Sequence, residues 1–311
     1  MATASSGVFQ NLAPLETQRI FTPLGIRFWD FAQDRTVEDG LAAYAVSPVP
    51  GLDPIPATRT ASGIYAFQGL PGLREVEYPP SNSNSLTSPP RAVPFVIFAY
   101  DLLDRYLPQA FTLELPLPYR GIFLSNEVTS PPGAAARAYL FSAPTRAVPS
   151  GCAAIRAQLW DKAANAPVKF AALQVSIAGN RWTGISDQNG AVAVLFPYPP
   201  LDQLSLGSPP GSGQGNIYNT TWPVSVQIQS QPSHLKFPLG VMTNLPVSWM
   251  ATPSLKSVLN DQGSATIWNT EAGPPAVTFS ATLPYGAELV LRTGAIVTEK
   301  FSGSLLITPA P

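Results

Sequence analysis

Proline limits what this chain can fold into more than any other residue type, because it occurs 35 times in 311 residues. A proline inside a helix removes one backbone hydrogen bond and clashes with the preceding turn, at a cost of about 3 kcal/mol. Glycine adds 23 further interruptions. A mostly helical fold is therefore excluded, and because the glycines follow no period of three, a collagen helix is excluded as well.

The rest of the composition describes a chain that can fold but carries few charges. Hydrophobic residues make up 45% and aromatic residues 10%, which is enough to fill cores and excludes a wholly disordered chain. Charged residues make up only 12%, against about a quarter in an average soluble domain. Short alternating segments between proline and glycine turns are typical of β-sandwiches, so the sequence predicts an all-β protein with several domains.

The sequence also contains an internal duplication, in which five blocks recur in the same order. The paired blocks are 26–30 and 155–161, 42–46 and 171–175, 62–67 and 189–194, 70–71 and 196–197, and 94–98 and 223–227. Along the chain the offset between the copies stays between 126 and 131 residues. One block can match by chance, but five in order indicate two related domains.

Each copy has the local pattern of a β-sandwich. In the second copy, Ile155, Ala157 and Leu159 alternate with Arg156 and Gln158, so one face of this strand is expected to lie against a core. In the third pair of blocks, the dipeptide Asn-Gly is a strong hairpin signal, because such a turn needs positive φ angles. The sequence therefore predicts tandem β-sandwiches with proline-rich loops.

These patterns divide the chain into five parts. The prediction is an N-terminal arm (1–22), a first β-sandwich (23–126), a linker (127–149), a second β-sandwich (150–244) and a C-terminal β region (245–311). The linker is inferred from two prolines, a glycine and a run of alanines. The C-terminal region either completes the second sandwich or forms a small third domain.

The compartment and partners are inferred from what the sequence lacks. The first residues carry no secretory signal and no segment reaches the roughly 20 apolar residues of a spanning helix, so we expect cytoplasmic synthesis and no membrane span. The formal net charge is −1 and the basic residues form no cluster, so nucleic-acid binding is not expected. A single histidine and a single cysteine exclude a structural zinc site and an intrachain disulfide, and we expect no metal and no cofactor.

The two chemically distinctive residues have ordinary explanations. His234 lies in a polar loop and lacks the carboxylate and nucleophile that a catalytic triad needs, so a surface histidine is the preferred interpretation. Cys152 opens a strand, and no base or helix N-terminus in the sequence would lower its pKa. We interpret it as a small buried residue.

Two pairs of carboxylates, Asp101 with Asp104 and Glu75 with Glu77, could be proposed as the acid and base of a glycosidase. Such a pair must face across a cleft at about 5–10 Å, which neighbouring positions in the sequence do not establish. The first pair is better explained as part of a turn after a strand. We therefore expect no catalytic residues.

Six tryptophans are candidates for a binding surface, since their rings can stack on sugars. Trp29 and Trp160 occupy equivalent positions in the two copies, which favours a role in packing. Trp182 follows Asn180 and Arg181 and is the candidate for a surface contact. A module that binds a glycan or a cell surface through Trp182 is therefore the alternative function.

Three phrases of the first copy, Val37–Leu41, Ser62–Phe67 and Leu70–Leu73, resemble those of transthyretin-like and carboxypeptidase-regulatory-like sandwiches, which also occur in Cna-B-type modules. This resemblance implies tandem Ig-like or transthyretin-like folds and no activity. Some Cna-B modules carry a Lys–Asn isopeptide bond. The first copy contains no lysine, so that crosslink cannot form there.

A resemblance that covers more of the chain is to uncharacterised proteins encoded beside phage-tail-like contractile injection systems. The stretches that carry it are Arg105–Pro108, Leu115–Gly121, Phe141–Pro149, Phe196–Pro199 and Glu288–Thr293. It implies a non-catalytic structural part of the particle, at the baseplate or the periphery, that assembles with other subunits in multiple copies. It also implies release from the cell as part of an extracellular particle.

Overall fold

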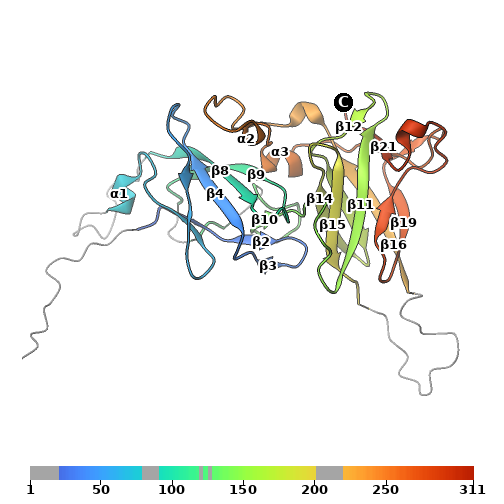
Figure 1. The fold of residues 1–311 in the computed structure, drawn as a ribbon, viewed down its shortest axis with the longest axis horizontal. Coiled ribbons are helices and arrows are strands. Elements are labelled where there is room, and N and C mark those ends of the chain that lie inside the picture. Colours follow the sequence, from blue (N-terminus) through green and yellow to red (C-terminus); the bar gives the residue numbers. More distant parts are fainter. Residues whose placement is uncertain (1–20, 79–90, 119–121, 125–127, 201–219) are drawn as a thin grey trace, which may run out of the picture.

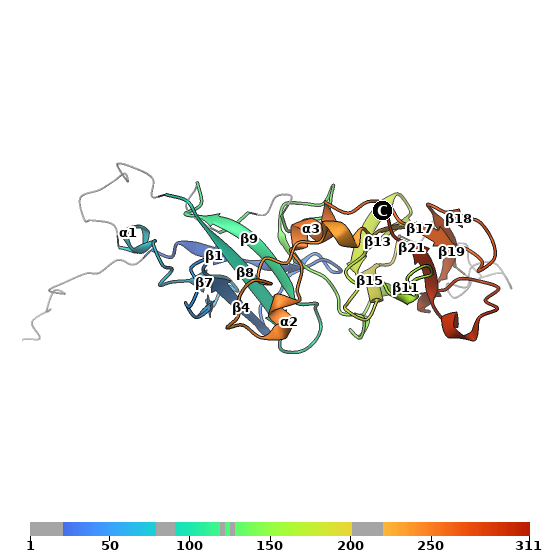
Figure 2. The ribbon, with the colours of Figure 1, turned by 90° about the horizontal axis from the view of Figure 1, so that it is seen from above.

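The computed structural model describes residues 21–78, 91–118, 122–124, 128–200 and 220–311. Two β-sandwich domains lie next to each other along the long axis of the molecule (Figure 1). A segment of the second domain, which carries two short helices and is drawn in orange, reaches over the first domain (Figures 1 and 2). The predicted all-β fold with tandem sandwiches is confirmed.

The first domain contains one four-stranded sheet, ordered β5-β4-β8-β9, which faces two three-stranded sheets, ordered β1-β7-β6 and β10-β2-β3. Its elements are β1 (Leu24–Ile26), β2 (Phe28–Asp30), β3 (Arg35–Thr36), β4 (Leu41–Val46), β5 (Ile55–Pro56), β6 (Thr58–Arg59), β7 (Tyr65–Phe67), α1 (Arg74–Glu77), β8 (Val93–Asp101), β9 (Gln109–Leu115) and β10 (Ala138–Leu140). Phenylalanine side chains dominate the core between the sheets, among them Phe28, Phe67, Phe95 and Phe111.

The second domain repeats this plan with a four-stranded sheet, ordered β14-β13-β16-β19, against a larger sheet around β11. Its strands are β11 (Cys152–Asp161), β12 (Ala166–Pro167), β13 (Ala172–Ile177), β14 (Asn180–Ile185), β15 (Ala191–Pro197), β16 (Thr221–Gln229), β17 (Thr266–Trp268), β18 (Pro275–Ala276), β19 (Phe279–Pro284), β20 (Leu289–Leu291) and β21 (Leu305–Thr308). Its helices are η2 (Pro232–His234), α2 (Val247–Met250), α3 (Leu255–Leu259) and η3 (Glu299–Phe301). Aliphatic residues dominate its core, which also contains Phe196.

The duplication extends to the pairing of the strands. Equivalent pairs are Ile26–Tyr65 with Ala157–Val192, Asp30–Arg35 with Asp161–Ala166, Asp30–Leu140 with Asp161–Ile307, and Val93–Leu115 with Trp222–Leu283. The last strands of the two domains therefore correspond as well, β9 to β19 and β10 to β21. Residues from β19 onward complete the second sandwich, which answers the question that the sequence left open about the C-terminal region.

One predicted block is out of register. The alignment of 42–46 with 171–175 is wrong by one residue, because Ala43 faces the first core while its counterpart facing the second core is Leu173. Both faces of β4 are buried or half-buried. No alternation of polar and apolar residues therefore marks which face of this strand lies against the core.

The predicted linker is also wrong in part. Residues 138–140 of the expected linker 127–149 form β10, which pairs in parallel with β2. Tyr139 and Leu140 are buried in the first core. The connection between the domains is therefore the shorter stretch that runs from β10 to β11.

A large insertion distinguishes the second copy from the first. In the first domain, residues 102–108 join β8 to β9, whereas in the second domain residues 230–278 join the equivalent strands β16 and β19. We call residues 235–259 of this insertion the latch. The latch leaves the second domain and packs on the outer face of the sheet that contains β4, β8 and β9.

Candidate functional site: the junction between the domains

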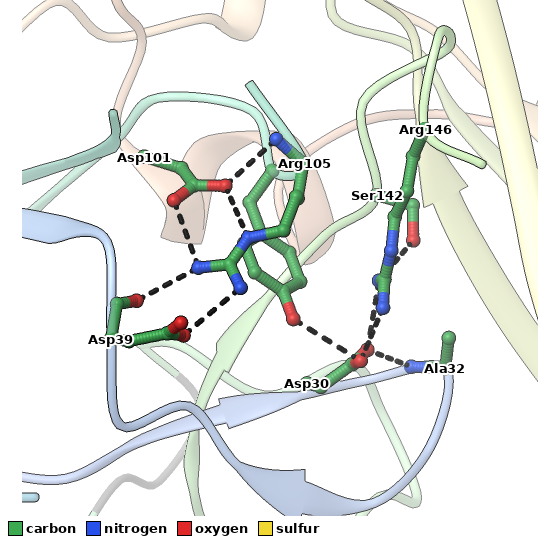
Figure 3. Close-up of polar contacts among 8 residues, drawn as sticks. Asp30, Ala32, Asp39, Asp101, Arg105, Ser142 and Arg146 are labelled. Atoms are coloured by element: carbon green, nitrogen blue, oxygen red, sulfur yellow. Dashed lines mark hydrogen bonds and ion pairs between the residues drawn. The ribbon is translucent and has the colours of Figure 1, made fainter. Parts of the chain in front are cut away.

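The junction is built around a buried ion pair. Arg146 lies in the connection after β10, and Asp30 ends β2; they are 6% and 0% exposed. Arg146 Nη1 donates to Asp30 Oδ1 at 3.0 Å and Nη2 to Oδ2 at 2.5 Å, so both carboxylate oxygens are held (Figure 3). Arg146 Nη1 also donates to Ser142 Oγ at 2.9 Å, and the backbone N–H of Ala32 donates to Asp30 Oδ1 at 2.9 Å.

Tyr106 closes this cluster. Its hydroxyl donates to Asp30 Oδ2 at 3.2 Å, and its ring lies 4.6 Å from the guanidinium carbon of Arg146. Burial, followed by the charge of Asp30, raises the pKa of Tyr106 to about 12. Burial alone would lower the pKa of Arg146, but the hydrogen bonds and charge of Asp30 outweigh it and raise the pKa. The guanidinium of Arg146 therefore stays charged and the phenol of Tyr106 stays neutral at physiological pH.

A second cluster joins the β8–β9 turn to the turn before β4. Arg105 Nε donates to Asp101 Oδ2 at 2.9 Å, and its Nη1 donates to Asp39 Oδ1 at 3.0 Å (Figure 3). The backbone N–H of Arg105 also donates to Asp101 Oδ2, at 2.7 Å. These hydrogen bonds, chiefly those to Asp101, raise the pKa of Arg105. The cluster orders the two turns beside Tyr106.

Arg156 extends the polar contacts into the second domain. It lies on β11 and donates to the backbone carbonyls of Pro144 and Arg146, the second at 2.8 Å from Nη2. Its Nε also donates to Glu288 Oε2 at 3.1 Å. The connection is thus held from both sides, by Asp30 of the first domain through the Arg146 side chain and by Arg156 of the second through the backbone.

The latch adds an apolar connection. Leu255, Val258 and Leu259 of α3 belong to the core of the first domain, together with Ile185 of β14. Gln262 fixes the base of the latch, because its Nε2 donates to the carbonyls of Phe170 and Val258 at 2.8 and 3.0 Å. The Oε1 atom of Gln262 accepts the backbone N–H of Gln231 at 2.9 Å.

Further along the latch, an indole ring covers the outer sheet face of the first domain. Trp249 of α2 stacks on Phe98 with ring centroids 4.3 Å apart and lies 4.9 Å from the ring of Tyr44. Leu239 and Leu245 are buried beside them. This face is aromatic and is shielded from water by a segment of the other domain.

The arrangement at the junction holds charged side chains in contact with one another. The carboxylates of Asp30 and Asp101 are both engaged by arginine side chains, so neither is placed to act as a free base. In the described ranges, no group of three or more His, Cys, Asp or Glu side chains could hold a metal ion. The contacts described here connect the two domains.

The residues weighed from the sequence lie elsewhere or take part only in structure. His234 is exposed in η2, and its Nδ1 lies 2.7 Å from the carbonyl oxygen of Asp261. Cys152 is a buried free thiol, and burial raises its pKa, which disfavours the reactive thiolate.

The two carboxylate pairs do not form acid–base pairs of their own. Asp101 is 4% exposed and is bound to Arg105, while Asp104 sits in the following turn with a positive φ of 53°. Glu77 is also buried, and its Oε1 accepts the backbone N–H of Gly69 at 2.6 Å. Both buried carboxylates therefore bind groups of the protein itself.

Trp182 is only half-buried, on β14. Its ring stacks on Phe196 with centroids 4.7 Å apart and packs against the core of the second domain. One face of the ring is therefore occupied from inside the protein. This placement favours a packing role for Trp182 over a role as a platform for a sugar.

The most important junction residues were missed by sequence reasoning. Arg146 was placed in the linker, and Trp249 in a C-terminal region without an assigned contact. One signal was present for Asp30, since the duplication aligns it with Asp161. Nothing in the sequence pairs Asp30 with Arg146, because they belong to segments far apart in the chain.

The two ends of the chain differ in how much of them the structure describes. Most of the predicted N-terminal arm lies outside the described residues. The C-terminal end is anchored, since Ala310 N–H donates to the carbonyl of Ser230 at 2.7 Å. Lys162, the first lysine of the chain, lies 3.4 Å from the ring centre of Trp268 and donates to the carbonyl of Glu271. None of the described helices is both long and apolar enough to cross a bilayer.

Comparison with known proteins gives weak structural similarities alone. The shaft pilin SpaA of Lactobacillus rhamnosus GG is 9% identical over 95% of this chain and 99% of that chain, with a TM-score of 0.23. The TIE protein of Bacillus anthracis is 10% identical over 84% of this chain and 44% of its own, with a TM-score of 0.22. A minor pilin of Streptococcus agalactiae is 6% identical over 93% and 98%, with a TM-score of 0.21. No protein-family model and no curated protein matches the chain.

Proposed function

We propose that this protein is a non-catalytic structural subunit of a multiprotein particle and acts as a rigid two-domain spacer. The observation that carries the proposal is the double connection at the junction. A buried ion pair holds the connection from β10 to β11, and the latch of the second domain covers the first. Such a connection suppresses the relative motion that separately folded domains otherwise retain.

The polar part of the junction supports a mechanical role. Breaking a buried ion pair by removing one partner costs about 3–5 kcal/mol, because the other charge is left buried. The pair between Asp30 and Arg146 therefore resists displacement of the connection, and Arg156 transmits that restraint to β11. A subunit that must keep its neighbours at a set distance benefits from both.

The particle we propose is a contractile, phage-tail-like injection system, with the protein at the baseplate or the periphery in multiple copies. This finer proposal rests on the family phrases, such as Leu115–Gly121 and Phe141–Pro149. The second of these phrases contains Arg146, so the resemblance includes a residue of the ion pair.

Electron microscopy and mass spectrometry of purified particles test the proposal. The protein should be found in stoichiometric amounts in intact particles, at a defined position. A variant with a loosened junction, Arg156→Met combined with Trp249→Ala, should be incorporated less well than Arg181→Met combined with Trp249→Ala, in which the first change affects an exposed arginine of β14. A protein that occurs only as a free monomer and is absent from every particle would sink the proposal.

A further inference from the structure

Gln109 is a polar residue in an apolar part of the junction. It begins β9, pairs through its backbone register with Ala99, and is 5% exposed. Among the residues that the structure describes, neither its Nε2 nor its Oε1 has a hydrogen-bond partner. Leaving a buried amide unpaired is destabilising, so native structures nearly always supply a partner, often a water molecule.

A cavity lies next to this side chain. Its volume is about 20 Å³, measured as the space open to the centre of a water molecule. Three parts of the molecule meet there, since the lining includes Phe141 of the first domain, Ile185 of the second and Val258 of the latch, besides Gln109. A site needs about 10–15 Å³ by this measure to hold one water molecule, so the cavity has room for one.

The cavity and the amide fit each other chemically. A purely apolar cavity of this kind stays dry, because a water molecule inside it would lose its hydrogen bonds. Gln109 supplies a donor and an acceptor on one group. The terminal torsion of a glutamine is broad and roughly two-fold, so its donor and its acceptor can exchange places to suit a bound water molecule.

We propose that this cavity is a hydration site in which a water molecule binds the amide of Gln109 between the two domains and the latch. The water satisfies the only polar side chain among the lining residues and fills the space that the three parts leave where they meet. The site exists only while the second domain and the latch are docked on the first.

A second glutamine at the same junction provides a matched control. Gln262 makes three hydrogen bonds to backbone groups, two through Nε2 and one through Oε1. Its amide therefore needs no water molecule. The two side chains have the same chemistry and are both nine-tenths buried, and they differ in their hydrogen-bond partners.

The test is water–amide NOE spectroscopy on the full chain labelled with ¹⁵N-glutamine. The Gln109 side-chain amide should show a cross-peak to a bound water, and the Gln262 amide should show none. The variant Gln109→Leu assigns the peak by its loss. A crystal structure of each protein should show a water within about 3 Å of the Gln109 amide in the wild type and none in the variant.

Three outcomes would overturn the proposal. The first is an empty cavity in the wild type. The second is a Gln109 amide that bonds to a protein group instead of water. The third is a water that remains in place in Gln109→Leu, because Gln109 would then not be what binds it. If the variant does not fold, the comparison of the two amides in the wild-type protein decides the question.

Discussion

Asp30 and Asp161 occupy equivalent positions in the two domains, at the ends of β2 and β11, yet they differ in the side chains that they bind. Each accepts backbone N–H groups of the turn that follows, from Ala32 in one copy and from Ala163 in the other. Asp30 alone of the two also binds a buried arginine. The duplication therefore supplied a turn carboxylate twice, and the junction uses one of them as an ion-pair partner.

This difference predicts unequal effects of the same substitution. Asp30→Asn should lower the free energy of unfolding by about 3 kcal/mol or more, because the charge of Arg146 is left buried without its partner. Asp161→Asn should change it by less than about 1 kcal/mol, since asparagine also caps such turns. Urea denaturation of both variants measures the difference, and equal losses would contradict a special role for Asp30.

Tyr106 predicts a pH dependence. Its pKa is raised to about 12, first by burial and then by Asp30, from the ordinary value of 10. The neutral phenol is favoured in the folded state, so its contribution to stability is complete below pH 10. Above that value the unfolded chain releases the proton first, and the contribution is lost between pH 10 and about 12.

Alkaline denaturation of Tyr106→Phe checks this sign. At neutral pH the variant should be less stable, because it loses the hydrogen bond to Asp30. The gap between wild type and variant should shrink by about 2–3 kcal/mol between pH 10 and 12, at about 1.4 kcal/mol per pKa unit. Tyr78→Phe, which alters an exposed ring, serves as the control. A gap that stays constant over this range would contradict the assignment.

At the scale of elements, the latch explains both what the sequence predicted and what it did not. Turns and alternating strands could be read directly, as at Gly190, where φ is 82°. The register of β4 could not, because the latch buries its outer face and removes the alternation. Helix α2 could not be placed either, since the contact of Trp249 with Phe98 joins distant parts of the chain. Local patterns report local geometry, whereas these contacts depend on the docked second domain.

The contacts of the latch lead to a prediction about stability. Trp249→Ala removes the ring that covers Phe98 and Tyr44 and should lower the free energy of unfolding by about 3 kcal/mol, the low end for such a truncation, because the indole is half-buried. It should also increase binding of a dye that reports exposed apolar surface. Val247→Ala, on the same helix and 75% exposed, should change neither property. A Trp249→Ala protein that matches the wild type in both would show that the latch does not stabilise this face.

At the scale of the whole molecule, the two domains are joined by two separate connections, one polar and one apolar. The polar one runs from Asp30 through Arg146 to Arg156 and restrains the connection between β10 and β11. The apolar one is the latch, which leaves the second domain after β16 and returns to it at β17. Because they use different segments, either one can keep the domains docked when the other is weakened.

This redundancy predicts a non-additive result in the shape of the molecule. Arg156→Met and Trp249→Ala should each leave the radius of gyration in small-angle X-ray scattering close to that of the wild type, since one connection remains. The double variant should be more extended and should show a broader distribution of interdomain distances. Both substitutions weaken the docking of the same two domains, so their effects on the shape of the molecule are not additive. Arg181→Met combined with Trp249→Ala is the matched control, as Arg181 lies exposed on β14. A double variant as compact as the wild type would mean that the domains are held by contacts other than those of Arg156 and Trp249, and the rigid-spacer proposal would then have to rest on the part of the latch around α3.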